Sequence, residues 1–446
     1  MSTVYIVHAI DTEGPLYESL QAKFDRLKHL FGIDGLDRTE ATLAKLRAGE
    51  IDLGDKTEMV KLVLNGHLTN YNATWTQVNA MLDRILAPEF RTKMVDSFGE
   101  GWVFNWFCID LVGYVNNPRR RDLGFHNIYD HFAERLAQDP NCRDGVHFHF
   151  HPISTFRDAH YCGTHYLRYP EFFEVLARKV IERGFFPHAF RAGFQAERPD
   201  IHWFLEQFIP FDITNMALDD PTELDKTVDF RNGRSGDWRR APADWSVYRP
   251  DHDDYQRPGN CRRAIGRALN IMNRMASIDQ REMDKAFARA ETGLPTLVGL
   301  CSHDHRDIGP EVDHVRDLIA EAQKKYPGVT VKFAEAREAF RKVLWPERDS
   351  FPEFELEMRL HPASADDCAY VEIIAAKGAV FGPQPYLAIE TRGKRFITDN
   401  LDFDTRPGRW FYAFHHDTLP LEEVARVGVG ANDAFGSTSV KVLDFR

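Results

Sequence analysis

Three histidines alternate with phenylalanine in the segment His147-Phe148-His149-Phe150-His151-Pro152. If this segment is extended, side chains at every second position point to the same side of a strand. The three imidazoles would then share one side and the two phenyl rings the other. Because imidazole is the commonest protein ligand for zinc and similar cations, this spacing predicts part of a metal site.

Two carboxylates that could complete such a site follow the first apolar run of the chain. Residues 4–10 read Val-Tyr-Ile-Val-His-Ala-Ile, a β-branched run typical of a buried strand. Asp11 and Glu13 come directly after this run, and a Gly14-Pro15 turn follows. Barrel-like α/β folds place their chemistry at the carboxyl ends of parallel strands, so we expect the acid pair at that edge.

Two more apolar runs end in polar side chains. The run at 185–190 leads to Arg191, and the run at 295–301 leads to His303 and His305. One such ending is ordinary, but four endings in separate parts of the chain are hard to explain by core packing alone. Cys301 closes the last run, and its apolar context favours a buried packing residue over a nucleophile.

Taken in order, these motifs resemble the polysaccharide deacetylase (NodB-homology) family of carbohydrate esterases. In that family an acid pair precedes Gly-Pro, and a His-(Ser/Thr)-x-x-His-Pro motif supplies two metal ligands, which fall here on His147 and His151. The resemblance implies one divalent ion, with zinc expected, and it assigns Asp11 as the base and Glu13 as the third ligand. The family's pair is Asp-Asp, so the Asp-x-Glu spacing of this chain leaves that division of roles open.

The resemblance also assigns the other catalytic residues. The arginine that orients the catalytic acid falls on Arg191. The late histidine that protonates the leaving amine falls on His303 or His305, which lie one strand period apart. The chain departs from the family motif by carrying an extra histidine, His149. This residue could replace a ligand, hydrogen-bond to one, or bind substrate, and the sequence leaves the three roles open.

Composition limits the partners that the chain can have. The formal charge of −12 argues against a nucleic-acid or anionic-membrane surface, both of which need clustered Lys and Arg. The local basic run 119–121 is interpreted as solvated turn residues. No run approaches the ~20 apolar residues of a membrane span, and no charged-then-apolar signal segment is visible. Six cysteines without a CxxC spacing indicate reduced thiols, so we expect a cytoplasmic protein.

The pattern of elements predicts two domains. Alternating strands and helices over residues 1–345 imply a parallel α/β domain, which the resemblance makes a distorted (β/α)7-type barrel of the deacetylase kind. Residues 16–95 form a helical insertion that would wall the site. A long helix is expected from near Arg262 to Ala290, and residues 219–259 form a long loop whose Trp238 and Trp245 favour the substrate side. Period-two strands over residues 351–446 predict a C-terminal β-sandwich.

These observations predict a metal-dependent enzyme that removes an acyl group, N-acetyl first, from a sugar or glycan precursor. A metal-dependent hydrolase of another class, such as an amidohydrolase or phosphoesterase, is the main alternative. Such enzymes usually carry His-x-His at the end of the first strand, where this chain has Asp-x-Glu. A non-catalytic glycan-binding protein on the same scaffold is the third reading. The oligomeric state and the role of the C-terminal domain are not predicted.

Overall fold

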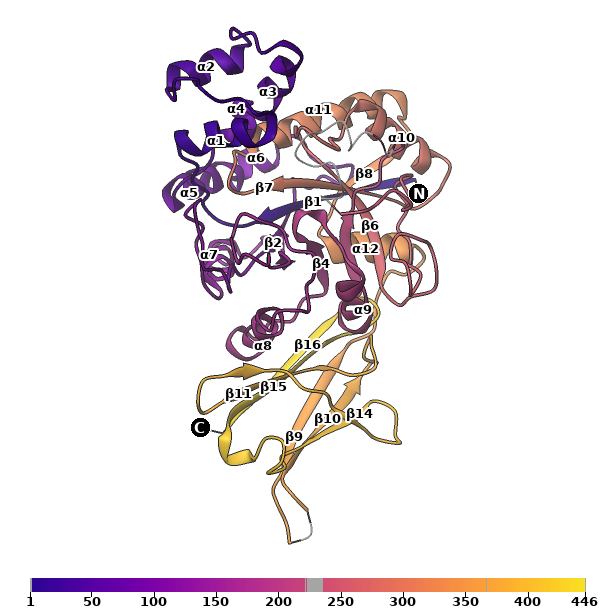
Figure 1. Cartoon of the computed structure of the whole chain (residues 1–446). Helices are drawn as coiled ribbons and strands as arrows, with labels where there is room; N and C mark the ends of the chain where they lie inside the picture. The colour runs from indigo at the N-terminus through magenta and orange to yellow at the C-terminus, as the bar shows by residue number, and fades with distance from the viewer. Residues whose placement is uncertain (1, 221, 223–235, 366, 446) are drawn as a thin grey trace.

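The computed structural model describes residues 2–220, 222, 236–365 and 367–445. Figure 1 shows an α/β barrel, formed by the chain from β1 (Thr3–Thr12) to α12 (Ala336–Leu344). Two antiparallel sheets built from the C-terminal residues lie below it. Within the described residues, no helix is long and apolar enough to cross a bilayer.

Seven parallel strands close into the barrel. After β1 they are β2 (Phe104–Cys108), β3 (Gly145–Phe150), β4 (Ala189–Ala192), β5 (Phe211–Asn215), β6 (Ala264–Asn270) and β7 (Thr296–His303). Neighbouring strands pair in this order, and β1 pairs with both β2 and β7, which closes the ring. A further strand, β8 (Thr330–Phe333), pairs with the first part of β1. The predicted α/β barrel is confirmed, whereas its relation to deacetylase barrels stays a prediction.

The strand β1 shows why these residues form a barrel. Every residue from Ile6 to Thr12 is buried, as expected for a parallel strand that is covered on both sides. Its register sets Asp11 beside Phe107 of β2 and beside His303 of β7. The carboxyl ends of β1 and β7 therefore meet at one edge of the barrel, where the polar residues of the sequence motifs lie.

Helices surround the barrel and connect its strands. They are α7 (Asn127–Leu136), α8 (Glu171–Arg183), α9 (Pro199–Phe208), α10 (Gln280–Glu291), α11 (Gly309–Lys325) and α12. Helix α8 is followed by Gly184, which has φ 59°, and the N–H of Phe185 donates to the carbonyl of Lys179 at 3.0 Å. Glycine accommodates this left-handed conformation without a steric penalty, so the sequence Arg-Gly stops the helix at this point.

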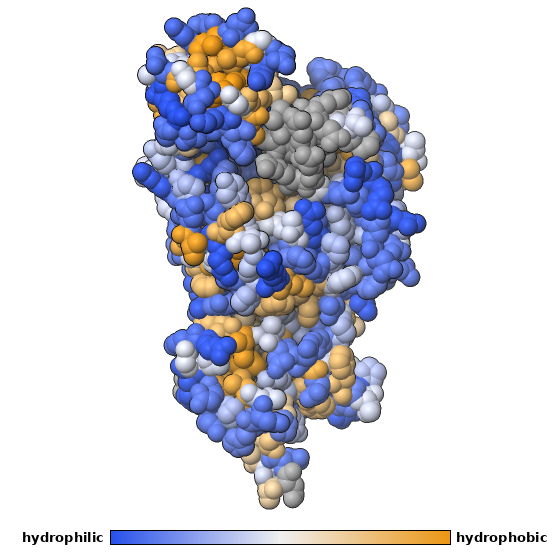
Figure 2. All heavy atoms as spheres, in the orientation of Figure 1, coloured by the Kyte–Doolittle hydropathy of each residue, from blue (hydrophilic) through white to orange (hydrophobic). Residues whose placement is uncertain are grey.

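The chain between β1 and β2 is helical, as the sequence predicts. It contains α1 (Leu20–Phe31), α2 (Glu40–Ala48), α3 (Thr57–Val63), α4 (Gly66–Thr69), α5 (Trp75–Ile85) and α6 (Pro88–Arg91). The first three of these helices share a small core of their own, which includes Phe24, Leu43 and Val60. Figure 2 shows hydrophobic residues over these helices and further hydrophobic patches lower on the same face.

The helix predicted from near Arg262 to Ala290 is wrong. Residues 264–270 form β6, and helix α10 begins only at Gln280. The strand is buried along its whole length and carries Arg267, which is neutralised inside the protein by Glu282 of α10 at 2.6 Å. A charged residue within an Ala- and Gly-containing run hides a buried strand, because the run shows no clear period-two alternation and only one β-branched residue, Ile265.

Trp238 and Trp245 give no support to the substrate-side interpretation of their loop, which stays a prediction. Both indoles are buried, at 1% and 0% exposure, and both belong to the barrel's main apolar core. Trp238 donates its indole N–H to the carbonyl of Gln195 at 2.8 Å, and Trp245 donates to that of Glu282 at 3.1 Å. Residues 221 and 223–235 of the predicted loop lie outside the described residues.

The C-terminal residues form two four-stranded antiparallel sheets. One contains β9 (Glu355–His361), β10 (Tyr370–Lys377), β13 (Asp402–Phe403) and β14 (Arg409–Ala413). The other contains β11 (Tyr386–Thr391), β12 (Phe396–Ile397), β15 (Val424–Asn432) and β16 (Thr438–Asp444). Their inner faces share one apolar core, to which Val371, Ile389 and Val427 belong. Whether this part forms a separable domain stays a prediction.

The second of these sheets packs against the barrel's helix α8. The Tyr386 hydroxyl donates to the carbonyl of Phe173 at 2.9 Å, and Arg426 donates to that of Ile181 at 3.1 Å. The Asn432 side chain donates to the carbonyls of Pro187 and Phe208 at 2.8 and 2.9 Å. These contacts lie on the outer surface of the barrel and not at the carboxyl ends of its strands.

Candidate active site and metal centre

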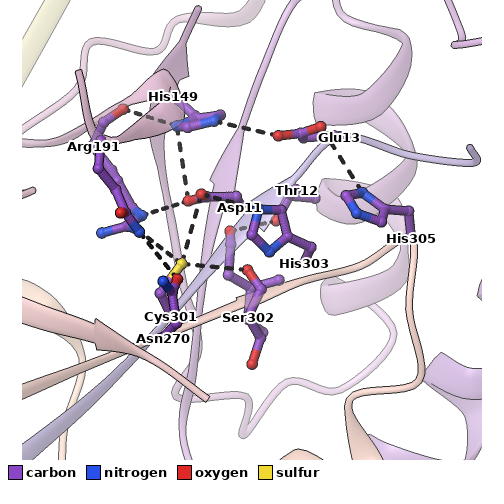
Figure 3. A network of polar contacts seen from close by, with 12 residues as sticks. Asp11, Thr12, Glu13, His149, Arg191, Asn270, Cys301, Ser302, His303 and His305 are labelled. Atoms are coloured by element: carbon purple, nitrogen blue, oxygen red, sulfur yellow. Dashed lines mark hydrogen bonds and ion pairs between the residues drawn. The ribbon is translucent and has the colours of Figure 1, made fainter. Parts of the chain in front are cut away.

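Polar residues from four barrel strands converge at the carboxyl edge. Figure 3 shows the carboxylates of Asp11 and Glu13, the imidazoles of His149 and His303, and the guanidinium of Arg191 pointing toward one another. Asp11 is the last residue but one of β1, His149 lies in β3, Arg191 in β4 and His303 ends β7. The motifs that the sequence placed in separate regions are thus brought together by the closure of the barrel.

Asp11 is held as an ionised carboxylate. Its Oδ1 accepts a hydrogen bond from Arg191 Nε at 2.6 Å, and Arg191 also donates to the carbonyl of Ile213 at 2.7 Å. Burial on its own would raise the pKa of Asp11, but the charge and the hydrogen bond of Arg191 outweigh it and lower the pKa to about 2. A buried, ionised carboxylate whose second oxygen faces the site can accept a proton. The pairing of Arg191 with Asp11 agrees with the sequence prediction.

Glu13, His149 and His151 form a triangle of possible metal ligands. The Nε2 atoms of the two histidines are 3.0 Å apart, and Glu13 Oε1 lies 3.7 Å from His149 Nε2 and 3.1 Å from His151 Nε2. Neighbouring ligand atoms of a tetrahedral zinc ion are about 3.3–3.4 Å apart, because the bonds are 2.0–2.1 Å long. The three separations scatter around this value, so the donor set fits a zinc-like ion with one position left open.

The hydrogen bonding of His149 also supports a role as a metal ligand. Its Nδ1 donates to the carbonyl of Arg191 at 2.8 Å, which leaves the lone pair on Nε2, the atom that faces Glu13 and His151. A metal-bound histidine usually donates its other ring N–H to a carbonyl or carboxylate in this way. Burial lowers the pKa of His149 and keeps that of His151 well below its ordinary value, so both rings are neutral and able to bind a cation.

A glycine makes room for His151. A Cβ atom built on Gly193 would lie 2.2 Å from His151 Cδ2 and 2.7 Å from its Cα. No side chain fits there without moving the histidine. The Phe-Arg-Ala-Gly motif therefore contributes two residues to the site, because Arg191 holds Asp11 and Gly193 gives space to a ligand.

His147 does not join this group, which corrects the sequence prediction that His147 and His151 share one ion. Its Nε2 contacts Asn105 Oδ1 at 3.1 Å and lies 3.5 Å from Glu335 Oε1. In an extended strand, four residues span ~13 Å. His147 and His151 point to the same side of β3 but reach different ends of the barrel, and His149 takes the ligand position instead.

Arg121 is part of the site, although the sequence suggested a solvated turn. It is buried and forms an ion pair with Glu13 Oε2, so that each oxygen of Glu13 has its own partner. His305 Nδ1 lies 3.9 Å from the same Oε2 and has no hydrogen-bond partner among the residues that the structure describes. No local pattern in the sequence signals Arg121, because its partner is more than one hundred residues away along the chain.

His303 faces Asp11 from β7, at 3.6 Å between Nε2 and Oδ2. Its Nδ1 accepts a hydrogen bond from Arg306 Nη2 at 3.2 Å, so the ring proton lies on Nε2, toward Asp11. Burial, together with the charge of Arg306, lowers the pKa of His303 to about 3. Of the two histidines predicted as the acid, His303 contacts Asp11, whereas His305 contacts Glu13.

Asp304, which no sequence motif predicted, holds the turn that carries Glu13. Asp304 accepts hydrogen bonds from the backbone N–H groups of Glu13 and Gly14, both at 2.8 Å. Its own carbonyl accepts a hydrogen bond from Asn72 at 3.0 Å. A carboxylate between two histidines could have signalled this role, but its target is a backbone group, which no side-chain motif reveals.

The helical insertion reaches the site, as predicted. Asn72, between α4 and α5, also donates to the carbonyl of Arg306 at 3.2 Å. The ring of Tyr71 lies edge-on to His305, with 5.7 Å between centroids. The insertion therefore forms a wall beside the ends of β1 and β7.

Cys301 is buried, as the sequence predicts, yet it contacts charged groups. Arg191 Nη2 donates to its Sγ at 2.8 Å, and the sulfur lies 3.6 Å from Asp11 Oδ2. Burial raises the pKa of the thiol, which therefore stays protonated. Its place behind Asp11 makes it a packing partner of the Asp11–Arg191 pair.

Comparison with protein-family models, with curated proteins and with solved structures gave no significant match.

Proposed function

We propose that this chain is a metal-dependent hydrolase that removes an acyl group, N-acetyl in the first instance, from a sugar or glycan precursor. One observation carries the proposal. An ionised Asp11, paired with Arg191, stands beside the Glu13–His149–His151 triangle, and His303 faces the same carboxylate. The order of the motifs along the chain supports a sugar as the substrate class.

The residues divide the work of hydrolysis between them. Glu13, His149 and His151 would hold the ion. The chemistry that a divalent ion supplies at such a site, when bound, is a lower pKa for water and positive charge for an acyl oxygen. Arg121 pairs with the outer oxygen of Glu13 and so fixes which oxygen faces the two histidines.

Asp11 acts as the base. Its Oδ2 accepts the proton of the attacking water as the water oxygen bonds to the acyl carbon. When the bond from that carbon to the sugar nitrogen breaks, the proton held by Asp11 passes to the nitrogen, which restores the carboxylate. His303 Nε2, 3.6 Å from Asp11 Oδ2, is placed to donate to this oxygen while Asp11 is ionised. Arg191 keeps Asp11 oriented and ionised between turnovers.

Acetate release tests this proposal directly. The assay compares acetylated sugars and nucleotide sugars as substrates, with protein as purified, after treatment with a chelator, and after zinc is added back. We expect release that is lost on chelation and regained with zinc. A parallel assay for phosphate release from phosphate esters tests the alternative class.

Two variants make the metal assignment specific. His151→Ala should lose both acetate release and the ion held by Glu13, His149 and His151. His416→Ala is the matched control, because this side chain is 90% exposed in the C-terminal part and should change neither. Full metal occupancy in His151→Ala, or metal-dependent phosphate release without acetate release, would contradict the proposal. A protein that binds glycans but hydrolyses none would favour the non-catalytic reading.

A further inference from the structure

A second group of possible metal ligands lies toward the opposite end of the barrel. It contains His147 of β3, His188 before β4, and Glu335 between β8 and α12. Glu335 Oε1 lies 3.5 Å from His147 Nε2 and 3.3 Å from His188 Nε2. Three segments that are distant in sequence thus direct one donor atom each toward a common point.

The donor separations match those of a bound ion. Asn105 Oδ1 lies 3.1 Å from His147 Nε2, which adds an amide oxygen to the two nitrogens and the carboxylate. The separations of 3.1, 3.3 and 3.5 Å bracket the edge of about 3.3–3.4 Å expected for tetrahedral zinc. Two histidines with oxygen ligands form a donor set that zinc accepts.

The His147 side chain occupies the space where a Cβ atom on residue 145 would lie, so glycine is needed there. A Cβ atom on Gly145 would lie 2.4 Å from His147 Nε2 and 2.9 Å from Glu335 Cγ. This repeats the relation between Gly193 and His151 at the carboxyl edge, where a Cβ would meet the ligand at 2.2 Å. At both places a glycine is required by the position of an imidazole.

The environment also favours a bound cation. His147 is 1% exposed, so its Nε2 meets Glu335 Oε1 and Asn105 Oδ1 inside the protein. The Glu335 carboxylate is fixed by the N–H groups of Arg337 and Glu338, at 3.1 and 3.2 Å, where it caps α12. The side chains of His188 and Glu335 remain 14% and 16% exposed, so an ion could enter from solvent.

We propose that His147, His188 and Glu335 bind a second divalent cation, with Asn105 as an available fourth ligand, and that this ion has a structural role. It would join β3, the segment before β4 and the turn that begins α12. With four protein ligands such a site leaves no position for substrate, which is the arrangement of structural zinc. The inference does not depend on the proposed function.

Elemental analysis of the whole protein tests this proposal. We expect two zinc ions per chain in the wild type, one in His188→Ala, one in His151→Ala, and none in the double variant. His416→Ala should keep both. Because the site lies away from Asp11, His188→Ala should retain acetate release while its melting temperature falls and responds less to a chelator.

Glu335→Gln provides a second variant, since glutamine keeps an oxygen that can cap α12 while removing the charge. It should also lose one ion. In crystals of the wild type, anomalous scattering at the zinc edge should give a peak between His147 and His188. A single peak at Glu13, with one ion per chain in both the wild type and His188→Ala, would overturn the proposal. Plain hydrogen bonds within the cluster would then account for the geometry. One ion that is lost in His188→Ala but kept in His151→Ala would support this site and contradict the active-site metal.

Discussion

The carboxyl edge of the barrel and the core of the C-terminal sheets bury very different side chains. At the barrel edge Asp11, Glu13 and Arg191 are all at most 5% exposed, and each is charged. Between the C-terminal sheets the shared core is apolar and includes Ile389 and Val427, both at 0% exposure. Burying apolar surface stabilises a fold, whereas burying charges does so only if each finds a partner.

The difference shows where function is located. A buried charge network is retained at a cost in stability, so its presence indicates chemistry, particularly where a polar atom such as His305 Nδ1 has no partner among the described residues. The core between the C-terminal sheets is apolar instead, and its burial stabilises the fold. Changes at the barrel edge should therefore affect activity first, and changes between the C-terminal sheets should affect stability alone.

The largest expected effect is on catalysis at the barrel edge. Asp11→Asn removes the proton acceptor while keeping the size of the side chain, so the rate of deacylation should fall by about 10²–10⁴-fold. Asp402→Asn, in an exposed strand of the C-terminal sheets, is the matched control and should leave the rate unchanged. A loss of less than tenfold in Asp11→Asn, measured by acetate release, would remove Asp11 from the base role.

Arg191→Met tests how the buried charges depend on each other. The variant leaves Asp11 buried without its cation, which should lower the free energy of unfolding by about 3–5 kcal/mol. Adding Asp11→Asn to this variant should recover part of the loss, since the unpaired charge is then gone. Urea denaturation of the two single variants and the double variant measures the coupling. Strictly additive losses would show that the pair does not act as a unit.

Ile389→Ala makes the corresponding change between the C-terminal sheets. Truncating this fully buried side chain leaves a cavity and should lower the free energy of unfolding by about 2–5 kcal/mol. The rate of deacylation by the folded protein should not change. Val442→Ala, at a position 38% exposed, should stay within about 0.5 kcal/mol of the wild type. Reduced activity in folded Ile389→Ala would contradict the division of roles between the two regions.

The smallest effect is a pH dependence of stability inside the barrel. His8 accepts a hydrogen bond from Trp102 at 3.1 Å, and burial lowers its pKa to about 4 from an ordinary value of 6.5. The unfolded chain therefore binds a proton before the folded one does. The stability present above pH 6.5 is lost as the pH falls toward 4, by up to about 3 kcal/mol.

The contribution of His8 is measured as the difference in stability between the wild type and a His8 variant. Other buried histidines titrate in the same range, so urea denaturation is compared between the wild type and His8→Gln at several pH values. His8→Gln should show a shallower fall in stability between pH 6.5 and 4, whatever its stability at neutral pH. An identical slope in both proteins would exclude His8 as a contributor.

The sequence allowed much of the candidate site to be predicted, for a definite reason. Apolar runs that end in Asp11, Arg191 or His303 indicate parallel strands, and the carboxyl ends of parallel strands lie at one edge of a barrel. The alternation of histidine and phenylalanine along β3 also predicted which side chains lie on the same side of the strand. The alternation could not decide which histidines share an ion, because three residues at period two point to one side over ~13 Å, and only the position of Glu13 selects His149 and His151.

Other residues could not be found in the sequence. Arg121 pairs with Glu13 across more than one hundred residues, and Asp304 acts on backbone N–H groups, so neither has a local signal. The strand β6 was mistaken for helix because Arg267 interrupts an otherwise apolar run, and the partner that permits its burial, Glu282, comes from another element. Local patterns do not record which distant group compensates a buried charge.

The sequence by itself determined the residue types of the chemistry and the strand ends that carry them. Those follow from local periodicity and from the chemistry of imidazole and carboxylate. Only the tertiary structure decided how the donors are grouped, because barrel closure sets which strand ends are neighbours and how far each side chain reaches. That closure separates His147, with His188 and Glu335, from His149 and His151, with Glu13, and so divides one histidine motif between two places in the barrel.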